Sequence, residues 1–201
     1  MAIKVANNQS LTAITALPSA VSGGAMTLLE TKTASSSATL DFTDNIDDTY
    51  DEYVFRFYDI HPATDNVYFS FQGNAAGGSG YNETITSTFF RDGHSEADDD
   101  TFLSYDVSND QGQGTAFQNI TRNIGNENDE CGVGYLHLFN PSSTTFVKHF
   151  IARTQIYYAA PYSYETYISG YFNTTSAIDE IQFKMSDGNI DAGVIKLYGI
   201  S

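Results

Sequence analysis

The sequence predicts an all-β protein, an antiparallel jelly-roll-like β-sandwich preceded by a short extended N-terminal arm. Three observations support this prediction. Phe and Tyr each occur 14 times, and both residue types favour strands. Apolar and polar residues alternate with a period of two in many short runs, which indicates strands with one packed and one wet face. No run shows the 3.6-residue apolar period of a helix.

The closing run GVIKLYGI, residues 193–200, shows the alternation most clearly. Val194, Lys196 and Tyr198 are predicted to share one face, with Ile195 and Leu197 on the other. The other strands are expected at short intervals with turn-forming residues between them, as in sandwiches and jelly rolls. They are predicted at 38–42, 52–60, 67–72, 84–91, 101–107, 115–122, 133–139, 145–158, 164–173, 178–184 and 193–199.

Residues 1–36 differ from the rest because they contain no aromatic residue and consist mainly of small or polar side chains. Such a segment cannot form a core alone, so we expect an arm that lies on another protein, with the sandwich spanning 37–201. The turn chemistry of residues 17–24 fits this interpretation. The alternative is that residues 27–33 form a first strand of the sandwich.

Composition excludes several classes of partner. Nine Lys and Arg stand against 25 Asp and Glu, which gives a formal charge of −16 and predicts no nucleic-acid partner. No apolar run reaches the roughly 20 residues of a membrane span, so no membrane insertion is expected. The first residues lack the basic-then-apolar order of a signal peptide. We therefore expect a protein that stays in the cytoplasm where it is made or leaves it within an assembly.

No catalytic residues are predicted. His137 and His149 lie in strands expected to pair across the turn at 140–143, so their rings could approach each other, but no third zinc ligand is spaced to join them. Cys131 follows an acidic run that disfavours a thiolate. Nucleophile-elbow, HExxH, Walker and dinucleotide motifs do not occur. The chain is therefore predicted not to be an enzyme.

Acidic loops are the weak candidates for a metal site, and no other cofactor is expected. Calcium prefers clustered carboxylate oxygens, and the candidates are Asp98, Asp99, Asp100, Glu127 and Asp129. The simpler interpretation is that these are solvated acidic loops. The Tyr-rich stretch supplies the candidates for a subunit interface or a glycan platform, because loop tyrosines offer rigid amphipathic contact area. These candidates are Tyr158, Tyr162 and Tyr164.

Three stretches resemble small β-rich virion proteins, of the capsid-decoration or tail-appendage type, from marine and cyanobacterial tailed phages. They are residues 35–42 with 53–57, residues 134–141, and residues 178–185 with 193–199, and the resemblance spans most of residues 25–201. It implies a non-enzymatic structural protein located in the virion, with no catalytic residues to transfer.

The arm and the resemblance together predict a protein that decorates the capsid or forms a small surface or tail appendage. Exposed sheet edges favour symmetric self-association, so we expect a homotrimer in contact with other capsid or tail proteins. The alternative is a carbohydrate-binding module that recognises host surface glycan, with or without calcium. A polysaccharide depolymerase ranks below both because no carboxylate pair stands out.

Overall fold

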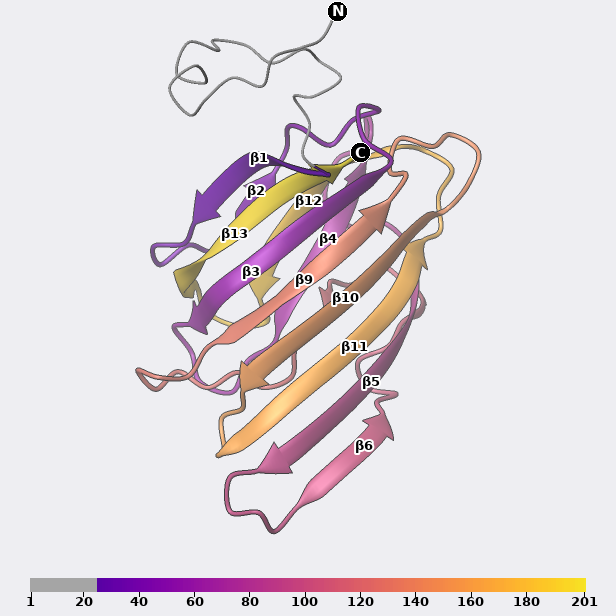
Figure 1. Cartoon of the computed structure of the whole chain (residues 1–201). Coiled ribbons are helices and arrows are strands. Elements are labelled where there is room, and N and C mark those ends of the chain that lie inside the picture. The colour runs from indigo at the N-terminus through magenta and orange to yellow at the C-terminus, as the bar shows by residue number, and fades with distance from the viewer. Residues whose placement is uncertain (1–24) are drawn as a thin grey trace, which may run out of the picture.

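The computed structural model describes residues 25–201, which form two antiparallel sheets packed face to face (Figure 1). The all-β sandwich predicted from the sequence is confirmed, and its strand order is compatible with a jelly roll. The larger sheet follows the order β1-β13-β3-β9-β10-β11-β5-β6, with β7 also pairing with β5. Its strands are β1 (Met26–Thr33), β13 (Ile190–Ile200), β3 (Glu52–Pro62), β9 (Gly132–Phe139), β10 (Lys148–Tyr157), β11 (Tyr162–Phe172), β5 (Ile85–Ser95), β6 (Thr101–Tyr105) and β7 (Gly112–Gly114).

The smaller sheet has the order β2-β12-β4-β8 and covers one face of the larger sheet. Its strands are β2 (Leu40–Phe42), β12 (Ile178–Met185), β4 (Phe69–Ala75) and β8 (Gln118–Asn119). The opposite face of the larger sheet, which we call the outer face, is turned toward the viewer in Figure 1. Among residues 25–201 no helix is long and apolar enough to cross a membrane.

Phenylalanine rings fill the space between the sheets. Phe183 of β12 stands at the centre, with ring centroids of Phe55 at 5.2 Å, Phe57 at 5.3 Å and Phe42 at 6.0 Å. The three contacts are edge-to-face, the arrangement that aromatic quadrupoles favour. Tyr53, Phe55 and Phe57 are buried while Arg56 is exposed, although Val54 on the same face as Arg56 is buried as well.

The N-terminal arm predicted for residues 1–36 is wrong in its C-terminal part. β1 pairs with β13 from Met26↔Ile200 to Thr33↔Val194, so the alternative of a first strand is correct. Ser37 then bridges Ile190. Residues 1–24, the remainder of the predicted arm, lie outside the described residues.

The strand predicted at 115–122 is also shorter than expected, because buried amide side chains replace sheet hydrogen bonds there. Gln72 donates from Nε2 to the carbonyls of Thr115 (3.2 Å) and Ala116 (3.0 Å). Gln118 is fully buried, accepts from the Ser87 hydroxyl at 2.6 Å and donates to the Asn109 carbonyl at 2.9 Å. The backbone carbonyls of Thr115 and Ala116 thus accept from a side chain where no neighbouring strand pairs with them.

Candidate functional site

Two of the three predicted interface or glycan tyrosines are strand residues rather than loop residues. Tyr162 and Tyr164 begin β11. Tyr164 is only 3% exposed and stacks on Tyr158 with centroids 5.1 Å apart, so it serves the protomer's own packing and is not available for contact. Tyr162 donates to Asp100 at 3.1 Å and lines a pocket of about 230 Å³ with Tyr158.

A buried charge cluster that the sequence did not reveal lies beneath this pocket. Asp106 is 6% exposed and forms ion pairs with Arg91 (3.3 Å) and Arg122 (3.1 Å). Arg91 also donates to the Tyr164 hydroxyl at 2.7 Å. Burial raises the pKa of Tyr164, so its hydroxyl stays protonated. A buried carboxylate between two guanidinium groups is a structural pairing, and it fixes the position of the tyrosine stack.

The acidic side chains that were predicted as calcium candidates contact different neighbouring residues. The Asp98 carboxylate contacts His94 at 3.0 Å, and Asp99 accepts from Ser95 at 2.6 Å. Glu127 is exposed, and its amide donates to the buried carboxylate of Glu130 at 2.7 Å. Within residues 25–201 no three His, Cys, Asp or Glu side chains are grouped to hold a metal ion. The candidate residues, Asp98, Asp99, Asp100, Glu127 and Asp129, are thus not assembled into one site in this part of the chain.

The two strand histidines do not form the pair that the sequence suggested. β9 and β10 do pair, but His137 lies opposite Ile151 rather than His149. The His137 ring instead hydrogen-bonds to Glu52, and the His149 ring packs edge-on against Tyr171 at 5.8 Å. Separately, burial raises the pKa of the Cys131 thiol, which keeps it protonated and unreactive.

A shallow trough follows β10 across the outer face. It consists of three adjoining hollows of about 400, 500 and 490 Å³. The central hollow shares Thr88, Ile151 and Ser169 with the first, and Phe139 and His149 with the third. The side chains that define the trough are Thr86, Thr88, Phe90, Tyr135, Phe139, Phe146, His149, Ile151, Arg153, Tyr167, Ser169 and Tyr171.

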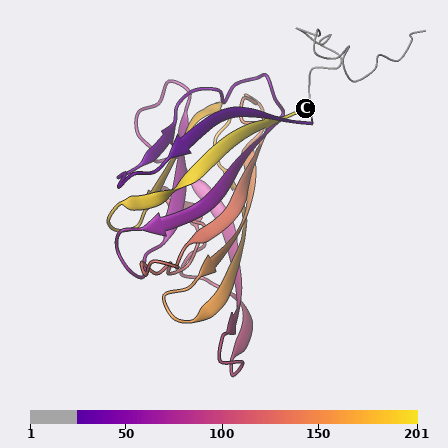
Figure 2. The same ribbon diagram turned by 60° about the vertical axis from the view of Figure 1, so that its left-hand side comes forward.

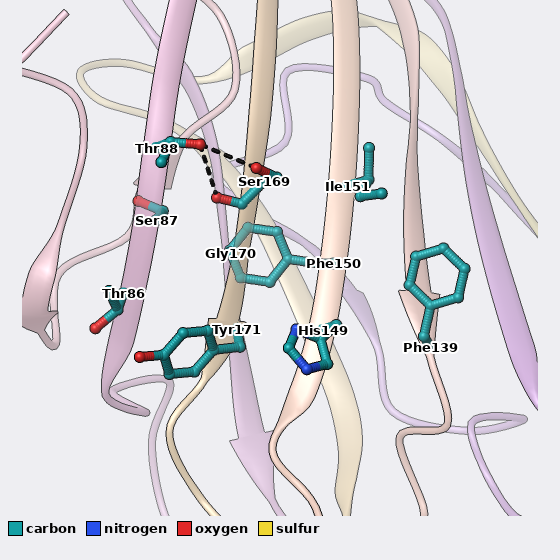
Figure 3. A pocket seen from close by; sticks show the side chains of 10 residues that line it. All are labelled: Thr86, Ser87, Thr88, Phe139, His149, Phe150, Ile151, Ser169, Gly170 and Tyr171. Atoms are coloured by element: carbon teal, nitrogen blue, oxygen red, sulfur yellow. Dashed lines mark hydrogen bonds between the residues drawn. The ribbon is translucent and has the colours of Figure 1, made fainter.

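The central hollow combines aromatic walls with hydroxyl groups (Figure 3). Tyr171, His149 and Phe139 lie side by side from β11, β10 and β9. Beyond them Thr88 and Ser169 meet with their hydroxyl oxygens 2.9 Å apart. Together these groups offer both apolar surface and hydrogen-bonding capacity to solvent.

An ion pair closes one end of the trough. Arg153 pairs with Glu165 and lies 5.0 Å over the ring of Tyr167. This guanidinium lowers the pKa of Glu165. Glu165 also accepts a hydrogen bond of 2.6 Å from Tyr167, and this bond raises the pKa of Tyr167 to about 12. The ring, the cation and the carboxylate therefore hold one another in place.

The residues of the trough come from four strands, so no motif within one stretch of the sequence predicts it. Thr88, Tyr135, Arg153 and Tyr171 come from β5, β9, β10 and β11. The sequence does contain one signal for such a site. Several strands carry aromatic residues on the solvent-exposed face, where alternation alone would place polar residues.

Comparison of the chain with family models, with curated proteins and with solved structures gave no match.

Proposed function

We propose that the protein is a non-enzymatic structural protein of a tailed-phage virion, which decorates the capsid or forms a small surface or tail appendage. The sequence resemblance supports the virion setting. The anchoring role is proposed for residues 1–24, because β1 takes the following residues into the sheet. In this proposal the protein forms a symmetric homo-oligomer, expected to be a trimer, that contacts other virion proteins.

One observation carries this proposal, an exposed apolar edge at the β6 end of the larger sheet. Leu103 and Val107 are 74% and 77% exposed. Phe90 and Tyr105 are also exposed and pack together with ring centroids 4.9 Å apart. We call these four residues the β6 patch. β6 ends the strand order, and this end of the sheet projects from the body (Figure 2).

An unpaired edge with large apolar side chains is a site for association with another chain. In a symmetric oligomer every subunit uses the same residues, and the β6 patches of the subunits can meet around the symmetry axis. Such a contact needs no catalytic group. Among the described residues His137 and His149 are held by separate partners, which accords with a structural role.

The test combines two measurements. Light scattering should show an oligomer for the intact chain and a mass near 22.0 kDa for the double variant Leu103→Asp, Val107→Asp. Leu28→Asp is the matched control, since Leu28 is 51% exposed on β1 at the opposite edge, and it should keep the oligomer.

Antibody against the protein should label tailed-phage particles in electron micrographs. A monomeric intact chain would contradict the interface, and unlabelled particles would contradict the virion role.

A second candidate function, recognition of host surface carbohydrate, is favoured by the trough. Clefts that combine aromatic surface with a few polar groups are typical of ligand sites. The two functions are compatible, because the β6 patch and most of the trough use different side chains.

A further inference from the structure

We propose that the trough binds an uncharged polysaccharide segment, a chain of neutral hexoses laid along β10 on the outer face. This inference rests on the second proposed function, carbohydrate recognition. It moves the recognition site away from the tyrosine pocket around Tyr162.

The chemistry of the trough matches that of a sugar ring. A hexose has hydroxyl groups at its rim and apolar C–H faces, so it suits a surface that offers flat rings and small hydroxyls together. Tyr171, His149 and Phe139 supply the rings, and Thr88 and Ser169 supply the hydroxyls (Figure 3). Tyrosine and similar rings give rigid amphipathic contact area with little loss of conformational freedom.

The charge distribution selects an uncharged ligand. The chain carries a formal charge of −16, which repels acidic polymers at long range. The side chains lining the trough include no Asp, Glu or Lys, and the one Arg, Arg153, is neutralised by Glu165. The trough is therefore an electrically balanced strip on an acidic molecule. A cationic ligand would bind more strongly to the acidic groups elsewhere on the surface. An anionic ligand would find no unpaired cation in the trough.

The backbone of the trough excludes a peptide that binds by adding a strand to the sheet. A peptide that adds to a sheet does so through unpaired edge hydrogen bonds. β10 lies between β9 and β11, and β11 lies between β10 and β5, so their backbone groups are already paired. Only side chains face the trough, and these suit a ligand that carries its own hydroxyl donors and acceptors.

The length of the trough indicates an oligomer rather than a single sugar. Outward-facing residues of β10 run from Arg153 through Ile151 to His149, and Val147 and Phe146 come directly before the strand. The six residue steps from Arg153 to Val147 span about 20 Å in extended chain. A ring stands near each end, the half-buried Tyr167 beside Arg153 and Phe146, which is 68% exposed, beyond His149. Tyr171, His149 and Phe139 form a row across the strands, so a chain lying along β10 would cross this row between the two end rings.

The experiment is isothermal titration calorimetry of the full chain with hexasaccharides. The neutral probes are cellohexaose, laminarihexaose and maltohexaose, and the acidic probe is a mannuronate hexamer. We expect one or more neutral hexamers to bind and the acidic hexamer not to bind. Tyr171→Ala and Tyr167→Ala should each weaken binding by about tenfold, the loss expected for one aromatic contact.

Tyr162→Ala is the matched control, because Tyr162 is a half-buried tyrosine of the same strand outside the trough. It should leave binding unchanged, and all three variants should keep the melting temperature and oligomer mass of the intact chain. Binding lost in Tyr162→Ala but kept in both trough variants would overturn the inference and leave carbohydrate recognition standing. Preference for the acidic hexamer would overturn the ligand class. Failure of every hexamer to bind would overturn both the inference and the second function, while the light-scattering test of the β6 patch would stand independently.

Discussion

At the scale of single residues, the structure places charge inside the protein only where backbone or side-chain partners satisfy it. Lys148 is fully buried, and its Nζ donates to the carbonyls of Phe146 (2.7 Å) and Thr174 (3.1 Å). Burial lowers the pKa of this lysine. Because Phe146 forms one end of the trough, the lysine ties the shape of that end to the loop after β11. This role was not evident in the sequence, where Lys148 reads as an ordinary polar residue of a strand.

Asp179 of β12 is one exception, and it leads to a pH-dependent prediction. Its Oδ1 atom is buried without a hydrogen-bond partner, and burial raises its pKa above the ordinary value. The folded protein therefore binds this proton more tightly than the unfolded chain, so this group's contribution to stability falls as pH rises from the unfolded to the folded pKa. Asp179→Asn should melt at a higher temperature than the natural chain at pH 7. Calorimetric melts from pH 7 downward should show the difference shrinking and vanishing below the ordinary Asp pKa of about 3.9; a constant difference across this range would contradict the explanation.

At the scale of elements, the strands were predictable and their partners were not. Alternation located the strand at 178–184, which is β12 at Ile178–Met185, and the closing strand within β13. The same pattern could not show that β12 belongs to the smaller sheet while β13 joins the larger one, because that choice depends on contacts between distant residues. The strand predicted at 115–122 is shorter than expected for a local reason, since the side chains of Gln72 and Gln118 donate to backbone carbonyls of this segment.

Two N-terminal deletions can test whether the residues of β1 act as part of the folded sandwich or as an arm. Deleting residues 1–24 should leave cooperative melting intact, because the described sandwich begins after them. Deleting residues 1–33 removes β1, uncovers the edge of β13 and exposes the core surface against which Leu29 packs. Loss of one such apolar contact, about 2 kcal/mol, should lower the melting temperature by about 5 °C. An equal fall in both deletions, measured by calorimetry, would assign the stabilising contacts to residues 1–24 instead.

At the scale of the whole molecule, the acidic surface leads to a prediction about calcium. The carboxylates of Asp98, Asp99 and Asp100 have separate surroundings, with partners on His94, Ser95 and Tyr162. If these loops are only solvated, adding EDTA should leave the melting temperature unchanged. A bound ion at a hundredfold excess over its dissociation constant would stabilise the fold by about 2.7 kcal/mol. A fall of about 5–10 °C on chelation would therefore contradict the solvated-loop interpretation.

The whole-molecule view also explains why the candidate site escaped sequence reasoning. Tyrosines close together in the sequence drew attention to 158–164, yet Tyr164 is committed to packing against Tyr158 and Arg91. The trough draws on β5, β9, β10 and β11, and its aromatic residues become neighbours only when those strands pair. The Tyr-rich stretch predicted a surface made by tyrosines close in sequence, but strand order decides which tyrosines share a surface.

The position of β13 also affects how the chain folds. β1 has its strand partner in β13, and β3 has one of its two neighbours there, so this end of the larger sheet depends on residues 190–200. β9 pairs with β10 and β10 with β11, and such local hairpins form quickly. Pairing of β13 with β1 and β3 is slower because a much longer loop must close first. We therefore expect the outer face around β10 to form early, and the insertion of β13 between β1 and β3 to be the step that completes the larger sheet.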